Sequence, residues 1–181
     1  MLMLASSVHG FSLNFVLLVL RVYLGAMIMS HGYFKIFRGG KLAGTGAWFD
    51  SIGMKPGRLH ATIAAFTEIG VGVLLIAGLL TSFAAAGLIA LMIVAMWTVH
   101  VKNGFFVFHP GQGVEYCLMI AVAALVPGTF GAGRYSLDNL FLHPHFLTKP
   151  SHALAITLIL GIGGAALQLL VFFRPPSEKT S

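Results

Sequence analysis

Five apolar stretches divide the chain, and polar or glycine-containing segments separate them. They cover residues 13–34, 59–79, 83–101, 114–126 and 152–173. All but the fourth approach the roughly 20 residues that a helix needs to cross a bilayer. Lipid offers no hydrogen-bond partner to backbone N–H and C=O groups, so each stretch is expected to form a helix. The pattern predicts an all-α fold, an integral membrane helical bundle.

The segments between the stretches predict how the helices connect. Residues 37–58 are polar and contain several glycines, and we expect a loop there, with Pro56-Gly57 as a turn signal directly before the second helix. A minimal turn at Thr81-Ser82 joins the second helix to the third. These two helices must therefore be antiparallel neighbours.

Composition agrees with a membrane protein and excludes several other classes. The chain is 57% hydrophobic and 9% charged, whereas soluble domains average about 25% charged residues. The formal net charge of +6 is spread over short segments between apolar runs, which is typical of membrane-protein loops and does not indicate nucleic-acid binding. The single cysteine, Cys117, excludes an intrachain disulfide.

The lysines and arginines outside the apolar stretches predict an orientation. Eight of them fall on the side of the 37–58 segment and two, Arg134 and Lys149, on the other side. Cytoplasmic loops of membrane proteins carry the excess of basic residues. We therefore expect an outside N-terminus and a cytoplasmic C-terminus.

The first stretch carries an arginine where a membrane helix rarely has one. An arginine at the centre of a membrane costs about 2.5–3.5 kcal/mol on insertion scales, so Arg21 needs a partner inside the protein. At 100° per residue, Arg21 shares one stripe with Gly25, Gly32 and Lys35, and the glycines allow another helix to come close. Glu68, near the middle of the second stretch, is the predicted partner. Such a pair either fixes helix packing alone or lines a polar pocket.

A second group of polar and aromatic residues is expected at one membrane interface, where helix ends converge. Snorkelling and an aromatic belt explain its lysine and phenylalanines, but explain its histidines and acid less well. A binding site is the alternative. The group comprises His31, Lys35, His100, Phe105, Phe106, Phe108, His109, Glu115 and Tyr116.

Motifs for resident metals and nucleotides are not found. The sequence has no closely spaced ligand pattern such as HExxH or CxxC, and no metal site is predicted. It has no haem or iron–sulfur signature and no glycine-rich nucleotide fingerprint. The His143-Pro144-His145 triplet is interpreted as surface histidines.

Two series of residues follow the order of a known family. The first is Arg21, Leu24-Gly25, His31-Gly32, Lys35, Glu68, Gly72, Gly78-Leu79, Thr81 and Ala84. The second is His100, Gly104-Phe105-Phe106, Glu115-Tyr116, Gly131 and Gly133-Arg134-Tyr135-Ser136-Leu137-Asp138. Together they resemble the DoxX family, small bacterial and archaeal membrane proteins that usually have four helices.

The resemblance covers roughly residues 13–140 and leaves the last helix outside the family pattern. It implies a four-helix membrane domain (13–140), and the apolar pattern adds an N-terminal segment (1–12), a loop (141–151), an extra C-terminal transmembrane helix (152–173) and a polar tail (174–181). It also implies a plasma-membrane location and an oxidoreductase role, by relation to the membrane subunit of archaeal thiosulfate:quinone oxidoreductase. Other members of the family are linked to oxidative-stress, quinone or catechol responses.

The leading hypothesis is a membrane subunit that binds a quinone or a similar lipophilic ring compound and serves an oxidoreductase. Histidines can relay protons near neutral pH, acids can shuttle them, and cations can stabilise a developing quinolate. Without a visible redox centre, a partner protein or a bound small cofactor must deliver the electrons. The predicted catalytic residues are His31, Glu68, His100 and Glu115, and the predicted substrate-binding residues are Arg21, Lys35, Phe105, Phe106 and Tyr116.

Two other functions remain open from the sequence. The first is a non-enzymatic scaffold that docks a soluble redox enzyme through the basic 37–58 segment. The second is a small-molecule transporter, for which five spans in 181 residues offer little room for two gates without a homo-oligomer.

Overall fold

The computed structural model describes residues 2–141 and 149–175. The predicted loop at 141–151, with its histidine triplet, and the polar tail at 174–181 lie largely outside these residues. The described part folds into helices with one isolated bridge, in agreement with the all-α prediction. The elements are α1 (Leu2–Phe37), α2 (Lys41–Ser51), α3 (Gly57–Ala77), α4 (Thr81–Ala95), η1 (Met96–His100), η2 (Val101–Asn103), α5 (Glu115–Phe130), α6 (Leu137–Phe141) and α7 (Pro150–Phe172).

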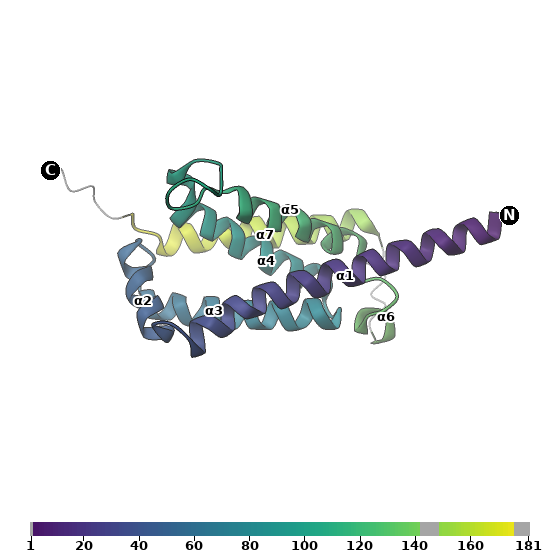
Figure 1. Ribbon diagram of the computed structural model, residues 1–181, viewed down its shortest axis with the longest axis horizontal. Helices are drawn as coiled ribbons and strands as arrows, with labels where there is room; N and C mark the ends of the chain where they lie inside the picture. Colours follow the sequence, from purple (N-terminus) through teal and green to yellow (C-terminus); the bar gives the residue numbers. More distant parts are fainter. Residues whose placement is uncertain (1, 142–148, 176–181) are drawn as a thin grey trace.

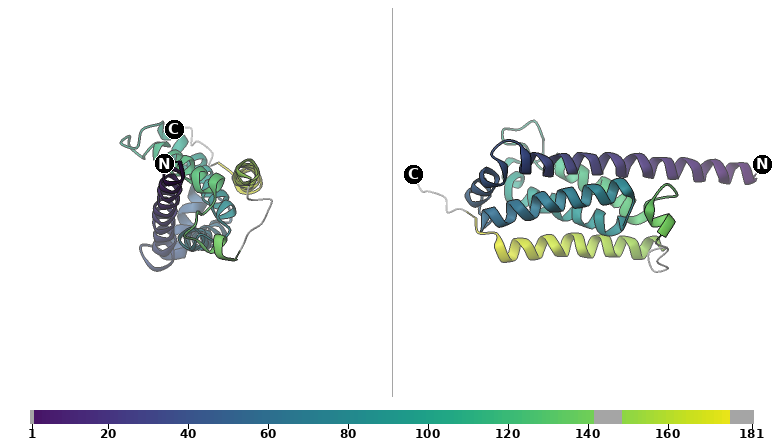
Figure 2. Two further views of the ribbon diagram at one scale, coloured as in Figure 1. Left: turned by 90° about the vertical axis from the view of Figure 1, so that its right-hand side faces the viewer. Right: turned by 90° about the horizontal axis from the view of Figure 1, so that it is seen from below.

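Five long helices run side by side, and two short helices lie at opposite ends of the bundle (Figures 1 and 2). The central helix is α4, which packs against α3, α5 and α7, while α1 packs against α3 and α5. The short helix α2 crosses one end, called here the α2 end, and α6 lies near the other, the α6 end (Figure 1). The N-terminal part of α1 projects past the α6 end.

Four helices are long and apolar enough to cross a membrane. They are Gly10–Phe37, Gly57–Ala77, Thr81–Asn103 and Pro150–Phe172. The fifth apolar helix, α5, has 16 residues and is shorter, as the 114–126 stretch predicted. Large apolar side chains on the outer faces are exposed, for example Leu170 at 78% and Ile159 at 69%. The chain is a membrane protein whose apolar helix faces contact lipid.

Small residues seven positions apart set the register between α1 and α3. A Cβ atom on Gly25 would lie 2.6 Å from the carbonyl oxygen of Gly72, and one on Gly32 would lie 2.6 Å from that of Ala65. Both helices therefore approach to backbone contact, as the glycines of the first stretch predicted. In this antiparallel register Arg21 lies beside the C-terminal turn of α3.

We expect Gly32→Leu to destabilise the bundle by about 1–3 kcal/mol, because the new side chain overlaps the backbone of α3. Gly10, on the same helix, has no atom within 4 Å of the position that a Cβ would take. Gly10→Leu is therefore the matched control. The measurement is the melting temperature of the purified variants in detergent, and equal melting temperatures would contradict the proposed register.

The prediction of a simple loop at 37–58 is wrong, because this segment contains α2. Gly46 lies against the first turn of α3, where an added Cβ would be 2.9 Å from the Cα of Arg58. The Asp50 carboxylate accepts a hydrogen bond from the Gly57 N–H at 2.8 Å. The glycines that suggested a loop thus let α2 pack tightly on α3. α3 begins at Gly57, directly after the predicted turn.

The C-terminal helix α7 closes the bundle. It packs against α4 and α5 through a face of small residues, and a Cβ on Gly161 would lie 3.2 Å from the carbonyl oxygen of Ala86. The buried hydroxyl of Thr157 lies 3.2 Å from the carbonyl oxygens of both Ser82 and Gly128. These contacts hold α7 against α4 and α5.

Candidate functional site

The partner predicted for Arg21 is wrong. Arg21 is 1% exposed, and its guanidinium donates to backbone carbonyl groups. Nη1 donates to Leu75 O at 3.0 Å and to Ile76 O, Nε donates to Ala132 O at 3.2 Å, and Nη2 donates to Tyr135 O. The last carbonyl groups of a helix have no intrahelical partner, and Arg21 supplies donors at the C-terminal turn of α3.

The Arg21 contacts belong to a larger polar cluster at the α6 end. The Asp138 carboxylate accepts from the N–H groups of Leu80 and Thr81 at 2.7 and 3.0 Å, and from the Thr81 hydroxyl at 2.7 Å. Gly78, with φ of +65°, lies between Arg21 and Ser136, and any Cβ there would overlap both. We call Arg21, Gly78, Thr81, Ser136 and Asp138 the anchor cluster. Its contacts hold the α3–α4 turn and the 131–138 segment together.

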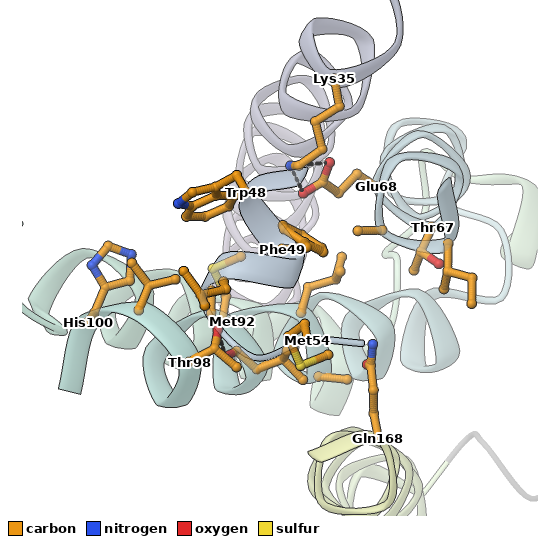
Figure 3. A pocket seen from close by; sticks show the side chains of 18 of the residues that line it. Lys35, Trp48, Phe49, Met54, Thr67, Glu68, Met92, Thr98, His100 and Gln168 are labelled. Carbon is orange, nitrogen blue, oxygen red and sulfur yellow. Dashed lines mark hydrogen bonds and ion pairs between the residues drawn. The ribbon is translucent and has the colours of Figure 1, made fainter. Parts of the chain in front are cut away.

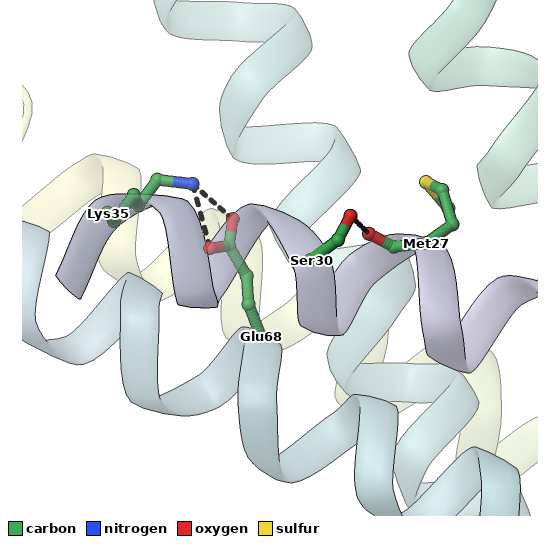
Figure 4. A network of polar contacts seen from close by, with 4 residues as sticks. All are labelled: Met27, Ser30, Lys35 and Glu68. Carbon is green, nitrogen blue, oxygen red and sulfur yellow. Dashed lines mark hydrogen bonds and ion pairs between the residues drawn. The ribbon is translucent and has the colours of Figure 1, made fainter. Parts of the chain in front are cut away.

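Glu68 of α3 forms an ion pair with Lys35, which lies on α1 near the α2 end of the bundle. Lys35 Nζ lies 2.6 and 2.7 Å from the two carboxylate oxygens of Glu68, as Figures 3 and 4 show. The side chains are 19% and 8% exposed, respectively. Lys35 lies 14 residues after Arg21 on the same helix, so the ion pair and the anchor cluster are roughly 20 Å apart along α1.

The first cavity lies behind the ion pair, among α2, α3, α4 and α7, and we call it the α2 cavity (Figure 3). It encloses about 230 Å³. Most of its wall is apolar, including Phe49 and Met92, and small residues such as Gly87 leave the space open. Its polar lining consists of Lys35, Glu68, Thr67, Thr98, His100 and Gln168.

The second cavity lies on the other side of the ion pair, among α1, α4 and α5, and we call it the α5 cavity. It also encloses about 230 Å³, and its wall includes His31 and Tyr116. The two cavities share Lys35, Glu68, Met92, Ala95 and His100. The ion pair and His100 therefore form a polar boundary between two mainly apolar spaces.

His100 reaches both cavities from a distorted helix end. The third stretch was predicted to be one helix over 83–101, but α4 ends at Ala95 and continues as the π-helical turn η1, whose last residue is His100. π-helical turns inside α-helices are frequent at functional sites. Nδ1 of His100 donates to the carbonyl oxygen of Gln112 at 2.8 Å. This hydrogen bond orients the ring and leaves Nε2 as the second polar atom.

Besides Arg21, three predicted site residues lie outside both cavities. The Glu115 carboxylate accepts from the Val107 N–H at 2.9 Å and ties the 104–113 loop to the start of α5. Phe105 and Phe106 are 49% and 46% exposed, and Phe106 stacks on Phe108 with ring centroids 5.0 Å apart. Their predicted roles in chemistry or ring binding stay predictions, and we do not include them in the candidate site.

Sequence reasoning missed most of the cavity lining, and Trp48 and Gln168 show why. Trp48 belongs to α2, which was interpreted as a loop, and Gln168 belongs to α7, which lies outside the family pattern. For Gln168 a signal did exist, because it is an amide inside a transmembrane helix and such polar residues are rare there.

The candidate site thus comprises five predicted residues: His31, Lys35, Glu68, His100 and Tyr116. It combines a cation, an acid, two imidazoles and a phenol with apolar walls, which suits a small lipophilic molecule that carries hydrogen-bonding groups. Within residues 2–141 and 149–175, no group of three or more His, Cys, Asp or Glu side chains is placed to hold a metal ion.

Comparison with protein families gives one match. Residues 16–101 match the family model described as DoxX. No curated protein matches the chain, and no solved structure does so either. The matched segment runs from α1 to the start of η2 and includes His31, Lys35, Glu68 and His100.

Proposed function

We propose that this chain, a member of the DoxX family through residues 16–101, binds a quinone or similar lipophilic ring compound and serves a membrane-associated oxidoreductase. One observation carries the proposal. The part-buried Lys35–Glu68 ion pair and His100 separate two cavities whose other walls are mostly apolar. The oxidoreductase part rests on what the family resemblance implies.

The polar boundary suits the chemistry of a quinone head group. Its carbonyl oxygens need hydrogen-bond donors, and its ring and tail need an apolar surrounding. The Lys35 ammonium has three N–H groups, two of which point to Glu68, so one remains for a ligand oxygen. As an imidazolium, with Nδ1–H bound to the Gln112 carbonyl oxygen, His100 can donate a second hydrogen bond or a proton through Nε2.

Reduction of a quinone to a quinol consumes two electrons and two protons. In the proposed site Glu68 and His100 exchange protons with the ligand, because both border the two cavities. The groove between α1 and α2, which encloses about 700 Å³ and is lined by Lys35 and Arg38, is the proposed proton route from the surface. A redox protein bound to the membrane surface supplies the two electrons.

Direct binding of a short-tailed quinone tests the proposal. We expect the wild-type protein in lipid nanodiscs to bind it above the level of empty nanodiscs. His100→Phe should weaken binding about tenfold, which corresponds to the loss of one hydrogen bond of about 1.5 kcal/mol. Phe173→Leu, at the C-terminal end of α7, serves as a control because Phe173 lines neither cavity. Wild-type protein that binds no more quinone than empty nanodiscs would contradict the proposal.

A second function, docking of a soluble redox enzyme, is favoured by the surface of the α2 end. Arg38, Lys41, Lys55 and Arg58 are all exposed there, around α2. This basic surface is the proposed contact for an acidic patch on the electron donor. By the positive-inside rule, the same surface supports our proposal that the α2 end faces the cytoplasm.

Charge reversal separates docking from ligand binding. We expect Arg38→Glu combined with Lys41→Glu to lose the partner in co-purification, because the two exposed charges that attract it are inverted. Glu68 variants should keep the partner, since Glu68 is buried. A partner retained by the charge-reversed protein would show that docking occurs elsewhere.

A further inference from the structure

Helix α7 contributes a polar residue to a cavity that otherwise belongs to the family-matched segment. Gln168 lines the α2 cavity, together with residues of α2, α3, α4 and η1. The family match ends at residue 101, well before α7 begins at Pro150. An amide within a transmembrane helix normally faces protein and has a partner. Gln168 therefore needs an explanation that the family pattern does not supply.

The Gln168 side chain has more hydrogen-bonding groups than it has partners. Its amide nitrogen donates to Nδ1 of His60 at 3.3 Å, and His60 is 1% exposed and packs edge-on against Phe172. A glutamine amide has two N–H donors and a carbonyl acceptor. Within the part of the chain that the structure describes, the amide has this one partner. One N–H remains for a molecule in the cavity.

Gln168 and the ion pair lie on opposite sides of the α2 cavity. Figure 3 shows Gln168 projecting from α7 toward the cavity, and Lys35 and Glu68 on the far side. The residues between these two poles are mostly apolar, including Phe49, Met54 and Met92. The cavity thus offers one donor at each pole and an apolar middle.

We infer that Gln168 binds the second oxygen of the ligand and makes the site selective for flat rings with two opposed oxygens, as in a 1,4-quinone. One oxygen accepts from Lys35 and the other from the free N–H of Gln168. A ring with adjacent oxygens satisfies only one pole. This inference rests on the proposed function, because it concerns the same cavity and the same class of ligand.

Two isomers test the inference on the wild-type protein. The probes are 2,3-dimethyl-1,4-naphthoquinone and 3,4-dimethyl-1,2-naphthoquinone, which have the same atoms but opposed or adjacent oxygens. Equilibrium binding is measured in lipid nanodiscs, with empty nanodiscs subtracted. We expect a preference of about tenfold for the 1,4 isomer, the effect of one additional hydrogen bond. Equal binding of both isomers overturns the inference but leaves the proposed function standing, whereas binding of neither contradicts the proposed function.

Variants then assign the preference to Gln168. Gln168→Leu should reduce the isomer preference to about one, with little change in binding of the 1,2 isomer. Leu170→Ala, on the lipid-facing side of α7 at 78% exposure, should keep the wild-type preference. An unchanged preference in Gln168→Leu overturns the inference. If Gln168→Leu does not fold, Gln168→Asn, which keeps the amide but withdraws it from the cavity, is compared in the same way.

Discussion

Changing Lys35 to methionine and Glu68 to leucine together should abolish quinone binding in a bundle that stays folded. A buried ion pair replaced by apolar residues is often neutral for stability, whereas removal of one partner leaves an uncompensated charge. Glu68→Leu alone should therefore lower the free energy of unfolding by about 3 kcal/mol, the lower end for buried pairs because Lys35 is 19% exposed. The double variant should recover most of that loss.

Quinone affinity, unlike stability, should not recover in the double variant. The double variant lacks the Lys35 ammonium, which is the charged hydrogen-bond donor at the cavity boundary, and we expect it to bind quinone at least about a hundredfold more weakly than the wild type. The measurements are melting temperature and equilibrium binding on the same protein samples. Thr62→Val, on α3 and outside both cavities, is the control. Normal binding by the double variant would mean that the ion pair serves only to pack α1 against α3.

Arg21→Met should destabilise the protein by about 3 kcal/mol or more without a direct effect on the cavities. The substitution leaves the carbonyl groups of Leu75, Ile76, Ala132 and Tyr135 without their donor at a position that is only 1% exposed, where water has little access. The melting temperature in detergent and the yield from membranes report the loss.

Arg134→Met is the matched control for Arg21→Met. Arg134 belongs to the same 131–138 segment, but its side chain is exposed. We expect the control to melt close to wild type. An Arg21→Met protein of wild-type stability that no longer binds quinone would contradict a purely structural role for Arg21.

The helices could be predicted from the hydrophobic pattern almost alone, because a long apolar segment in a membrane has to form a helix to satisfy its backbone hydrogen bonds. Each apolar stretch became a helix, and Pro56-Gly57 marked the start of α3 correctly. The register between α1 and α3 could also be predicted from the sequence. Gly25 and Gly32 are seven residues apart, as are Ala65 and Gly72, and pairing these small residues gives the observed register.

That register explains why the partner of Arg21 was predicted wrongly. With Gly32 beside Ala65, Arg21 lies beside Ile76, about 12 Å along the helix axis from Glu68. An acid is the partner that the sequence suggests for a buried arginine, because backbone carbonyl groups at a helix end leave no mark in a hydrophobic pattern. The distortion at η1 and the helix α2 were missed for a similar reason, since local backbone geometry and glycine packing depend on contacts with other helices.

The candidate site was predicted in part. His31, Lys35 and His100 were grouped because they lie at helix ends that converge, and the structure places all three around the α5 cavity with Tyr116. Glu68 was assigned to a different partner and belongs to this group instead. Trp48 and Gln168 could not be placed, because neither the position of α2 nor the face that α7 buries follows from the apolar pattern alone.

The central claim is that the polar boundary between the two cavities holds a quinone or similar ring compound. Mass spectrometry of lipid extracts from gently purified protein tests it most directly. We expect a near-stoichiometric quinone in extracts of the wild-type protein and of Thr62→Val, and none in extracts of the folded Lys35→Met/Glu68→Leu protein. The same amount of quinone in the double variant as in the wild type would contradict the claim.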